Sequence, residues 1–144
     1  KLGLPIPEIE KQLASQGGLL GLSGVGNDLR DIRAASLAGN ARATLAIETY
    51  VHSIRHYLGA YWIALGGCDA VVFTGGIGEN NPWLRDLVCG GLCELGLQLD
   101  PARNQAGVPE TNLAADSSRT RVLAIPANEE LVVAREARRH LGAA

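Results

Sequence analysis

The chain has 144 residues, of which 47% are hydrophobic and 19% are charged, and its formal net charge is −2. This composition argues against disorder, and the length suits one domain with a real core. The weak negative charge gives no reason to expect nucleic acid or a membrane as a partner, and no apolar run is long enough to span a bilayer. Three cysteines make no disulfide framework and favour a cytoplasmic chain. Because the sequence starts at Lys1 and has no Met, we expect a piece of a longer protein.

The first segments are predicted to be helices separated by glycines. A short helix is expected over residues 7–15, and the apolar stretch at 19–25 (LLGLSGV) predicts either a short strand or a buried loop. Asn27 is expected to cap a helix that runs to Ala38, with Asp28 in its first turn.

The longest predicted helix covers residues 40–65. Its apolar residues recur at the i, i+3, i+4 spacing of an amphipathic helix. Such a stripe is usually core, but its aromatic content leaves a subunit interface open. The stripe consists of Ile47, Tyr50, Val51, Ile54, Tyr57, Leu58, Tyr61, Trp62 and Leu65.

The second half of the chain alternates strands with helices. This order predicts an α/β layer fold in which the strands pair in parallel. The expected elements are a strand at 70–74, a helix at 82–95 with Leu84, Leu87 and Val88 on its buried face, a short strand at 97–99, a polar surface excursion at 101–119, a strand at 121–125 and a helix at 129–141 capped by Asn128.

The most informative segment covers residues 69–80 (DAVVFTGGIGEN), in which a short apolar run leads straight into three glycines. Asn80, Asn81 and Pro82 then predict a helix start with an Asn cap. A strand, a Gly-rich loop and a helix N-terminus form an arrangement that holds nucleotides. The segment is neither a P-loop nor a dinucleotide fingerprint, because Asn81 stands where the third Gly belongs. A tight turn without a ligand explains the glycines equally well.

Both main strands end in the same way. Since parallel strands end at one sheet edge, we expect Glu79, Asn80, Asn128 and Glu129 along one rim. A carboxylate beside nucleotide phosphates would hold Mg²⁺, directly or through water. Acids such as Glu129 and Glu130 also suit a helix N-terminus without any ligand, and the residues alone favour that simpler interpretation.

Two residue pairs invite a metal interpretation and do not support one. Cys89 and Cys93 lie four residues apart but have no further ligand nearby in sequence, so buried small residues are expected. His52 and His56 lack the intervening Glu of a zinc-protease motif and are expected at the surface or at an interface.

Three blocks, in this order, resemble the acetate kinase family. They are GLSG at 21–24 followed by NDLRD at 27–31, then FTGGIGEN at 73–80, then IPANEEL at 125–131. The resemblance implies an α/β fold that is the C-terminal part of an actin-like ATPase (ASKHA, ribonuclease H-like) domain, with parallel strands and flanking helices. Residues 1–144 would form the C-terminal portion of the family's nucleotide-binding and dimerisation domain, without the N-terminal domain.

The resemblance also implies site residues. Asp28, Leu29 and Arg30 would line the adenosine pocket. Gly76, Ile77, Gly78, Glu79 and Asn80 would form the loop against the adenosine and its first phosphate. Glu129 matches the family's magnesium-linked glutamate, which outweighs the helix-terminus interpretation. The implied cofactor is Mg²⁺, with Mn²⁺ as the alternative ion, and ATP or ADP is a substrate. The family's catalytic residues are expected upstream, with none in this chain.

The implied activity is reversible transfer of the ATP γ-phosphoryl group to acetate, giving acetyl phosphate and ADP, by a homodimer that pairs through the long helix. The chain alone is expected to be inactive, because it would supply only the adenosine side of the cleft. Two alternatives remain open. One is a propionate or butyrate kinase, since the acyl pocket lies outside this chain, and the other is a non-catalytic nucleotide-binding or dimerisation module.

Overall fold

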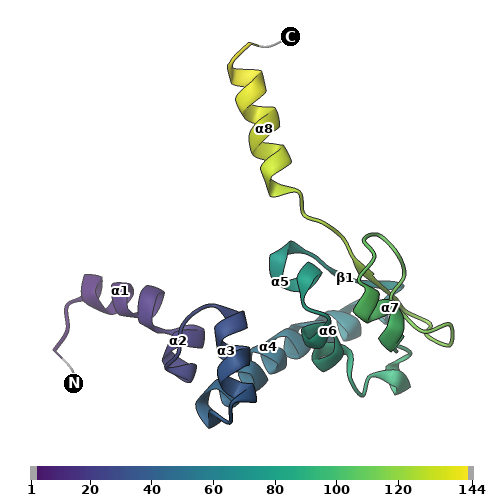
Figure 1. Cartoon of the computed structure of the whole chain (residues 1–144), viewed down its shortest axis with the longest axis horizontal. Helices are drawn as coiled ribbons and strands as arrows, with labels where there is room; N and C mark the ends of the chain where they lie inside the picture. Colours follow the sequence, from purple (N-terminus) through teal and green to yellow (C-terminus); the bar gives the residue numbers. More distant parts are fainter. Residues whose placement is uncertain (1–2, 143–144) are drawn as a thin grey trace. The chain divides into compact units, whose positions relative to one another are not determined.

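The structure is a computed structural model that describes residues 3–142, apart from the side chain of Glu129. It divides into two compact units, Lys1–Tyr61 and Trp62–Ala144. The first unit is helical. It contains α1 (Ile6–Gln16), α2 (Gly18–Ser23), α3 (Leu29–Leu37) and most of α4 (Ala41–Leu65), which are labelled in Figure 1.

The apolar stretch at 19–25 is a helix, so the prediction of a strand or a buried loop is wrong. Helix α2 ends at Gly24, which has a φ of 68° and donates its backbone N–H to the oxygen of Leu20. A side chain from α4 completes this end, because Arg42 donates to the carbonyl oxygens of Leu22 and Gly21 at 3.0 and 2.8 Å. Carbonyls at a helix end lack partners within the helix. The contact that favours a helix here therefore comes from a residue about twenty positions away.

Helix α3 begins one residue later than predicted. Its N-cap is Asp28, whose carboxylate accepts the N–H of Arg30 at 2.8 Å. Asn27, the predicted cap, accepts instead from the N–H of Leu20 and so ties α2 to the following turn. Both residue types cap helices well, and sequence alone does not separate two adjacent candidates.

The long helix is confirmed, but only part of its predicted core stripe is buried. Asn40 caps α4 by accepting from the backbone N–H groups of Arg42 and Ala43. Ile47 and Val51 are buried. Tyr57 and Tyr61 in the later turns remain 60% and 65% exposed. The simple core interpretation thus fails for the second half of the stripe.

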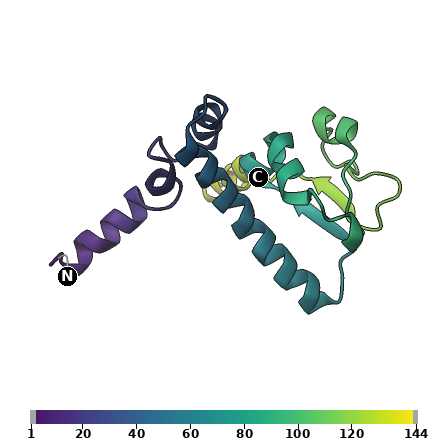
Figure 2. The same ribbon diagram turned by 90° about the horizontal axis from the view of Figure 1, so that it is seen from below.

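The second unit is built on two parallel strands, β1 (Ala70–Phe73) and β2 (Arg121–Ala124), which lie side by side in Figure 2. The predicted parallel pairing is confirmed, with Ala70 opposite Arg121. One further hydrogen bond, from Ile125 N–H to the Phe73 oxygen, extends the register past the strand ends. The two chain segments that follow the strands therefore start next to each other.

The segment between the strands differs from its prediction in several places. Helix α6 (Pro82–Cys89) stops before two glycines, and Gly91 adopts a φ of 72°. A 3₁₀ turn, η1 (Cys93–Leu95), follows in place of the helix predicted to continue through residue 95. Leu99 makes one isolated bridge to Ala114, not a strand.

The expected surface excursion at 101–119 contributes to the core. It contains α7 (Pro101–Ala106), which Asp100 caps by accepting from the Arg103 N–H. Leu113 is fully buried. Polar turn residues hide this role in the sequence, because only a few of the segment's side chains face inward. The buried apolar side chains of the unit include Leu84, Val88, Leu97, Leu113, Val122 and Ala124.

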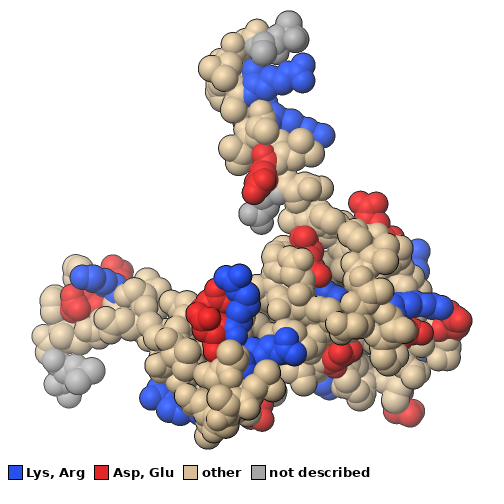
Figure 3. Space-filling model, in the orientation of Figure 1, with Lys and Arg blue, Asp and Glu red and all other residues tan. Residues whose placement is uncertain are grey.

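Helix α8 (Glu129–His140) closes the described chain. Its last turn carries Arg138, Arg139 and His140, and Figure 3 shows blue arginine or lysine side chains near this end of the chain. Cations at a helix C-terminus oppose the partial negative charge there. Within the described residues, no helix has the combined length and apolar character needed to cross a membrane.

Candidate nucleotide site

The Gly-rich segment after β1 forms a short helix, α5 (Gly75–Asn80), and not an open loop as predicted. Gly75 has a φ of 70°, which non-glycine residues rarely adopt. A Cβ on Gly78 would lie 3.3 Å from the carbonyl carbon and Cβ of Phe73. A Cβ on Gly76 would meet none of the described side chains and no backbone beyond its own helix within 4 Å. Backbone geometry and packing therefore account for Gly75 and Gly78, and they leave Gly76 without a structural reason.

Side chains occupy the last carbonyl oxygens of α5. Asn80 donates to the oxygen of Gly76 at 3.0 Å, and Asn81 donates to that of Ile77 at 2.8 Å. Asn81 is the N-cap residue of α6, as predicted, but its side chain makes no cap hydrogen bond. Its amide is committed to α5 and to the indole of Trp83. Asn80 is thus turned back on its own helix.

The two strand exits are tied together by Glu79. Its carboxylate accepts the backbone N–H of Ala127 at 2.8 Å, across 48 positions of sequence. The predicted rim is therefore confirmed for Glu79 and the segment after β2. Asn128 follows with a φ of 47°, and its side chain makes none of the predicted capping contact.

A cavity of about 580 Å³ opens between α5 and the start of α8. Of the predicted site residues, it brings together Gly76 and Glu79. Glu130 also lines it, whereas the side chain of Glu129 lies outside the described residues. The remaining lining residues are Gly75, Ala127, Asn128, Leu131 and Ala134. Ile77, Gly78 and Asn80 are not part of this wall.

The donor set of this cavity fits a hydrated magnesium ion that arrives with a nucleotide. Mg²⁺ keeps several waters and needs only one or two carboxylates in addition to the phosphates. Glu79 and Glu130 supply carboxylates, and Gly76 leaves a backbone surface without a Cβ. Among the described residues, no group of three or more acidic, His or Cys side chains is placed to hold a metal without such a ligand.

The first sequence block lies in the first unit and centres on an ion pair. Arg30 Nη2 lies 2.6 Å from Asp28 Oδ2, and Arg30 Nε lies 3.0 Å from Asp28 Oδ1. The Arg30 side chain and the N–H at the helix start lower the pKa of Asp28 to about 2. Leu29 between them is buried at 5% exposure, so its side chain packs in the helical core. Asp28 is therefore ionised at any physiological pH.

Arg85 is a residue that the motifs do not reveal. It is fully buried on α6, and its guanidinium donates to the carbonyl oxygens of Gly78 and Glu79 at 2.7 and 2.9 Å. Burial lowers its pKa. A sequence signal did exist, because Arg85 shares a helix face with Leu84 and Val88. Leu87, which was predicted on that face, is 46% exposed.

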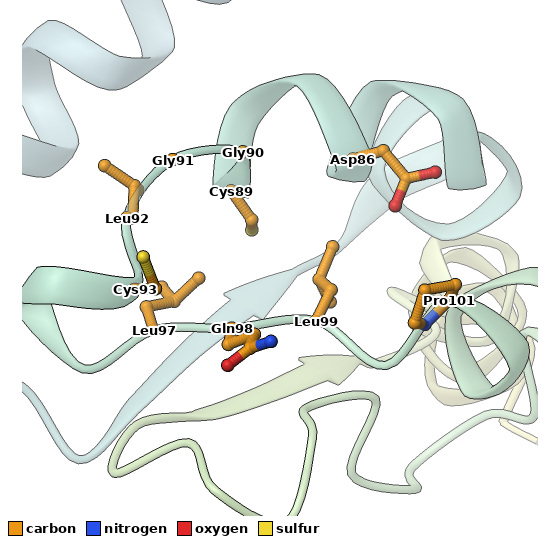
Figure 4. A pocket seen from close by; sticks show the side chains of 10 residues that line it. All are labelled: Asp86, Cys89, Gly90, Gly91, Leu92, Cys93, Leu97, Gln98, Leu99 and Pro101. Atoms are coloured by element: carbon orange, nitrogen blue, oxygen red, sulfur yellow. The ribbon is translucent and has the colours of Figure 1, made fainter.

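Cys89 and Cys93 line a different pocket, of about 280 Å³, which is shown in Figure 4. Cys89 is buried there, but Cys93 is exposed, so the prediction of buried cysteines holds only for the first. His52 and His56 are both exposed, as predicted. The rings of His56 and Tyr57 form a T-shaped pair with a centroid distance of 5.4 Å.

Comparison with known proteins identifies the fold and the family. The model of the acetokinase family matches residues 1–135. The acetate kinase of Leifsonia xyli subsp. xyli is 49% identical over 138 residues, which cover 95% of this chain and 34% of that protein. The acetate kinase of Natranaerobius thermophilus is 44% identical over 142 residues, or 99% of this chain and 36% of that protein. The chain thus spans about a third of the length of these curated relatives.

Solved structures agree with this match. The Porphyromonas gingivalis acetate kinase superposes with a TM-score of 0.84 at 38% identity, over 96% of this chain and 35% of its own. A propionate kinase from Francisella tularensis gives 0.83 at 37% identity, over 94% and 34%. The expected fold class, part of an actin-like ATPase domain with parallel strands and flanking helices, is confirmed. The chain belongs to the acetokinase family.

Proposed function

We propose that the full-length gene product is an acetate kinase and that this segment supplies the adenosine side of its cleft. The γ-phosphoryl group of ATP passes to a carboxylate oxygen of acetate, the bond to the bridging oxygen of ADP breaks, and acetyl phosphate forms. The observation that carries the proposal is the cavity where Gly76, Glu79 and Glu130 meet at the two strand exits. Ligands of open parallel sheets bind at this edge.

In this assignment, α5 approaches the nucleotide through its backbone. Gly76 has open space where a side chain would stand, which suits close contact with adenosine or its first phosphate. Ile77, Gly78 and Asn80 shape the same helix. Asp28, Leu29 and Arg30 form a second nucleotide-contacting block, in which the exposed guanidinium of Arg30 is available to a ligand. The catalytic groups come from outside residues 1–144.

Magnesium is the proposed cofactor, with manganese as the alternative, and Glu129 is its proposed protein partner. The ion would neutralise phosphate charge during an in-line transfer. Enzymes catalyse this kind of transfer mainly by positioning the reactants and stabilising the charge of the transition state. Glu79 and Glu130 line the same cavity and supply oxygen donors of the kind that Mg²⁺ prefers.

The glutamate assignment is tested with a matched pair of variants, Glu129→Ala and Glu130→Ala. They remove the same group from adjacent positions at the start of α8. We expect Glu129→Ala to lower the maximal rate and to raise the magnesium concentration needed for half of it. Glu130→Ala should have the smaller effect. An unchanged rate and magnesium dependence in Glu129→Ala would remove that residue from the site.

A propionate kinase is the second candidate, because one solved relative with a TM-score of 0.83 is a propionate kinase. The two activities are separated by acyl phosphate formation from ATP with acetate, propionate and butyrate at matched concentrations. The highest kcat/KM identifies the acid. ATP binding without turnover of any of the three would favour a non-catalytic module and refute the kinase proposal.

We further propose that the full-length protein is a cytoplasmic homodimer. Tyr57 and Tyr61 on α4 expose 60% and 65% of their surface in this chain, and exposed aromatic side chains are enriched at interfaces. Light scattering after size exclusion measures the mass directly. A dimer that Tyr61→Glu converts to a monomer supports this surface, and a wild-type monomer contradicts it.

A further inference from the structure

The largest fully buried side chain that the structure describes is a cation, Arg85. Arginine remains charged at physiological pH even though burial lowers its pKa. No carboxylate among the described side chains forms an ion pair with it. The carboxylate of Asp86 favours the charged form of Arg85 electrostatically without forming an ion pair. A buried charge of this kind is still costly unless hydrogen bonds replace its water. The fold therefore keeps a costly buried guanidinium on α6, and the hydrogen-bond partners of Arg85 indicate its role.

The guanidinium of Arg85 bridges two elements through four oxygens. Towards α5, Nη1 donates to the carbonyl oxygens of Gly78 at 2.7 Å and Glu79 at 2.9 Å. Towards α7, Nε donates to Asn104 Oδ1 at 2.7 Å and Nη2 donates to the Asn104 carbonyl oxygen at 3.0 Å. Asn104 is itself buried and donates to Asp86 Oδ1 at 2.7 Å. This fork therefore fixes the carbonyl end of α5 against α6 and α7.

The position of α5 matters because the helix is only six residues long. So short a helix has little stability of its own, and its last carbonyls carry partial negative charge without partners inside the helix. Asn80 belongs to α5 and Asn81 follows it directly, so their hydrogen bonds to the oxygens of Gly76 and Ile77 move with the helix. The hydrogen bonds of Arg85, by contrast, connect α5 to α6 and α7. From Glu79 the chain of contacts continues to Ala127 on the far side of the cavity.

We propose that Arg85 is a positioning residue for the nucleotide. It touches no substrate, but it holds α5 in the conformation that presents Gly76 and Glu79 to the cavity. This inference rests on the proposed function, which assigns the cavity to ATP. A positioning role predicts a selective loss of nucleotide affinity, whereas a merely structural role predicts lower stability with unchanged substrate constants.

The test uses the full-length gene product and three variants. Arg85→Gln removes the charge and the fork, and we expect the KM for MgATP to rise about tenfold while the KM for acetate stays within about twofold. Arg85→Lys keeps the charge but reaches fewer of the four oxygens, so it should restore part of the loss. The matched control is Arg103→Gln on α7, whose side chain binds the Ala114 oxygen and Asp116 and makes no hydrogen bond to α5. Its KM for MgATP should equal that of the wild type.

Asn104→Ala keeps the experiment decisive if Arg85→Gln does not fold. This variant removes the Oδ1 acceptor of Arg85 and the Nδ2 hydrogen bonds to Pro82 and Asp86, but it keeps the Asn104 carbonyl oxygen that Arg85 also binds. We expect about a threefold rise in the KM for MgATP. Where the double variant folds, adding Asn104→Ala to Arg85→Gln should raise that KM no further, because both changes break one contact chain.

The inference is overturned if the KM for MgATP stays within about twofold of the wild type in every folded Arg85 and Asn104 variant. It is also overturned if the KM for acetate rises by the same factor, since that indicates general damage. A wild-type protein that forms no acyl phosphate refutes the proposed function instead. The ATP dissociation constant, measured by calorimetry, then replaces KM in the same comparison of variants.

Discussion

Alanine at Gly76 and at Gly78 should have opposite effects on stability, although the two residues share one helical turn, and alanine at Gly76 should also weaken nucleotide binding. A Cβ on Gly78 would stand 3.3 Å from two atoms of Phe73, one of them backbone. Phe73 is the last residue of β1 and is paired with Ala124, so it cannot give way easily. Alanine at Gly78 must therefore push α5 away from the strand. A Cβ on Gly76 would stand in open space among the described residues, with nothing outside its own helix backbone within 4 Å.

The magnitudes follow from these two environments. Overpacking typically costs about 1–3 kcal/mol, while replacing a helical Gly by Ala gains about 0.5–1 kcal/mol. Gly76→Ala should show only the stabilisation from the Gly-to-Ala change. In Gly78→Ala the same stabilisation is reduced by the cost of overpacking against Phe73. We therefore expect Gly78→Ala to be less stable than Gly76→Ala by about 1–3 kcal/mol, which is the overpacking cost alone.

Although Gly76→Ala should not destabilise the fold, it should weaken nucleotide binding. Gly76 lines the cavity, and a methyl group there would meet a ligand that approaches the backbone closely. The assay pairs urea unfolding of both full-length variants with ATP titration by calorimetry. We expect Gly76→Ala to be at least as stable as the wild type but to bind ATP more weakly. Wild-type ATP affinity in Gly76→Ala would refute the close approach, and equal stability of the two variants would refute the packing argument.

Two further predictions concern single contacts. Glu79→Ala removes the acceptor of the Ala127 N–H, so hydrogen exchange at that amide should accelerate while exchange in β1 stays unchanged; equal exchange at Ala127 in both proteins would contradict the tie between the strand exits. Arg30→Gln should raise the pKa of Asp28 from about 2 towards the usual value near 3.9, as followed by carboxyl NMR. The pKa of Asp28 is lower in the folded than in the unfolded protein, so its contact with Arg30 stabilises the fold above about pH 4 and is lost as the pH falls towards 2. Arg30→Gln should therefore flatten the pH dependence of the unfolding free energy in this range. An unchanged Asp28 titration would show that Arg30 does not cause the low pKa.

Short-range patterns were enough to predict much of this fold. Asn40 caps α4 at the predicted helix start, and α8 starts directly after Asn128 although that side chain makes no capping hydrogen bond. These positions are predictable because i, i+3, i+4 periodicity and chain-breaking residues act locally. The alternation of strands and helices predicted parallel pairing, because parallel strands need a long crossover connection that usually contains a helix. The three sequence blocks identified the family, and with it the segments where the nucleotide is expected.

The sequence failed where a distant partner decides the local structure. Residues 19–25 are helical, with Arg42 holding the end of α2. Residues 101–106 form a helix within a segment predicted to be a polar surface excursion. Local signals for this helix exist, because Asp100 caps it, Pro101 starts it and Gly107 ends it. The sequence does not show that Asn104 of this helix is buried against Arg85. In both places these hydrogen bonds join residues that lie about twenty positions apart, beyond the reach of any local pattern.

By itself, the sequence determined the family, the parallel strands and the Gly-rich segment, because local propensity, hydrophobic period and motif identity are written in adjacent residues. Only the tertiary structure decided which glycine packs against Phe73 and which stands open, that Glu79 reaches Ala127, and that a buried Arg85 holds α5. These features depend on contacts between elements, and such contacts exist only once the chain has folded.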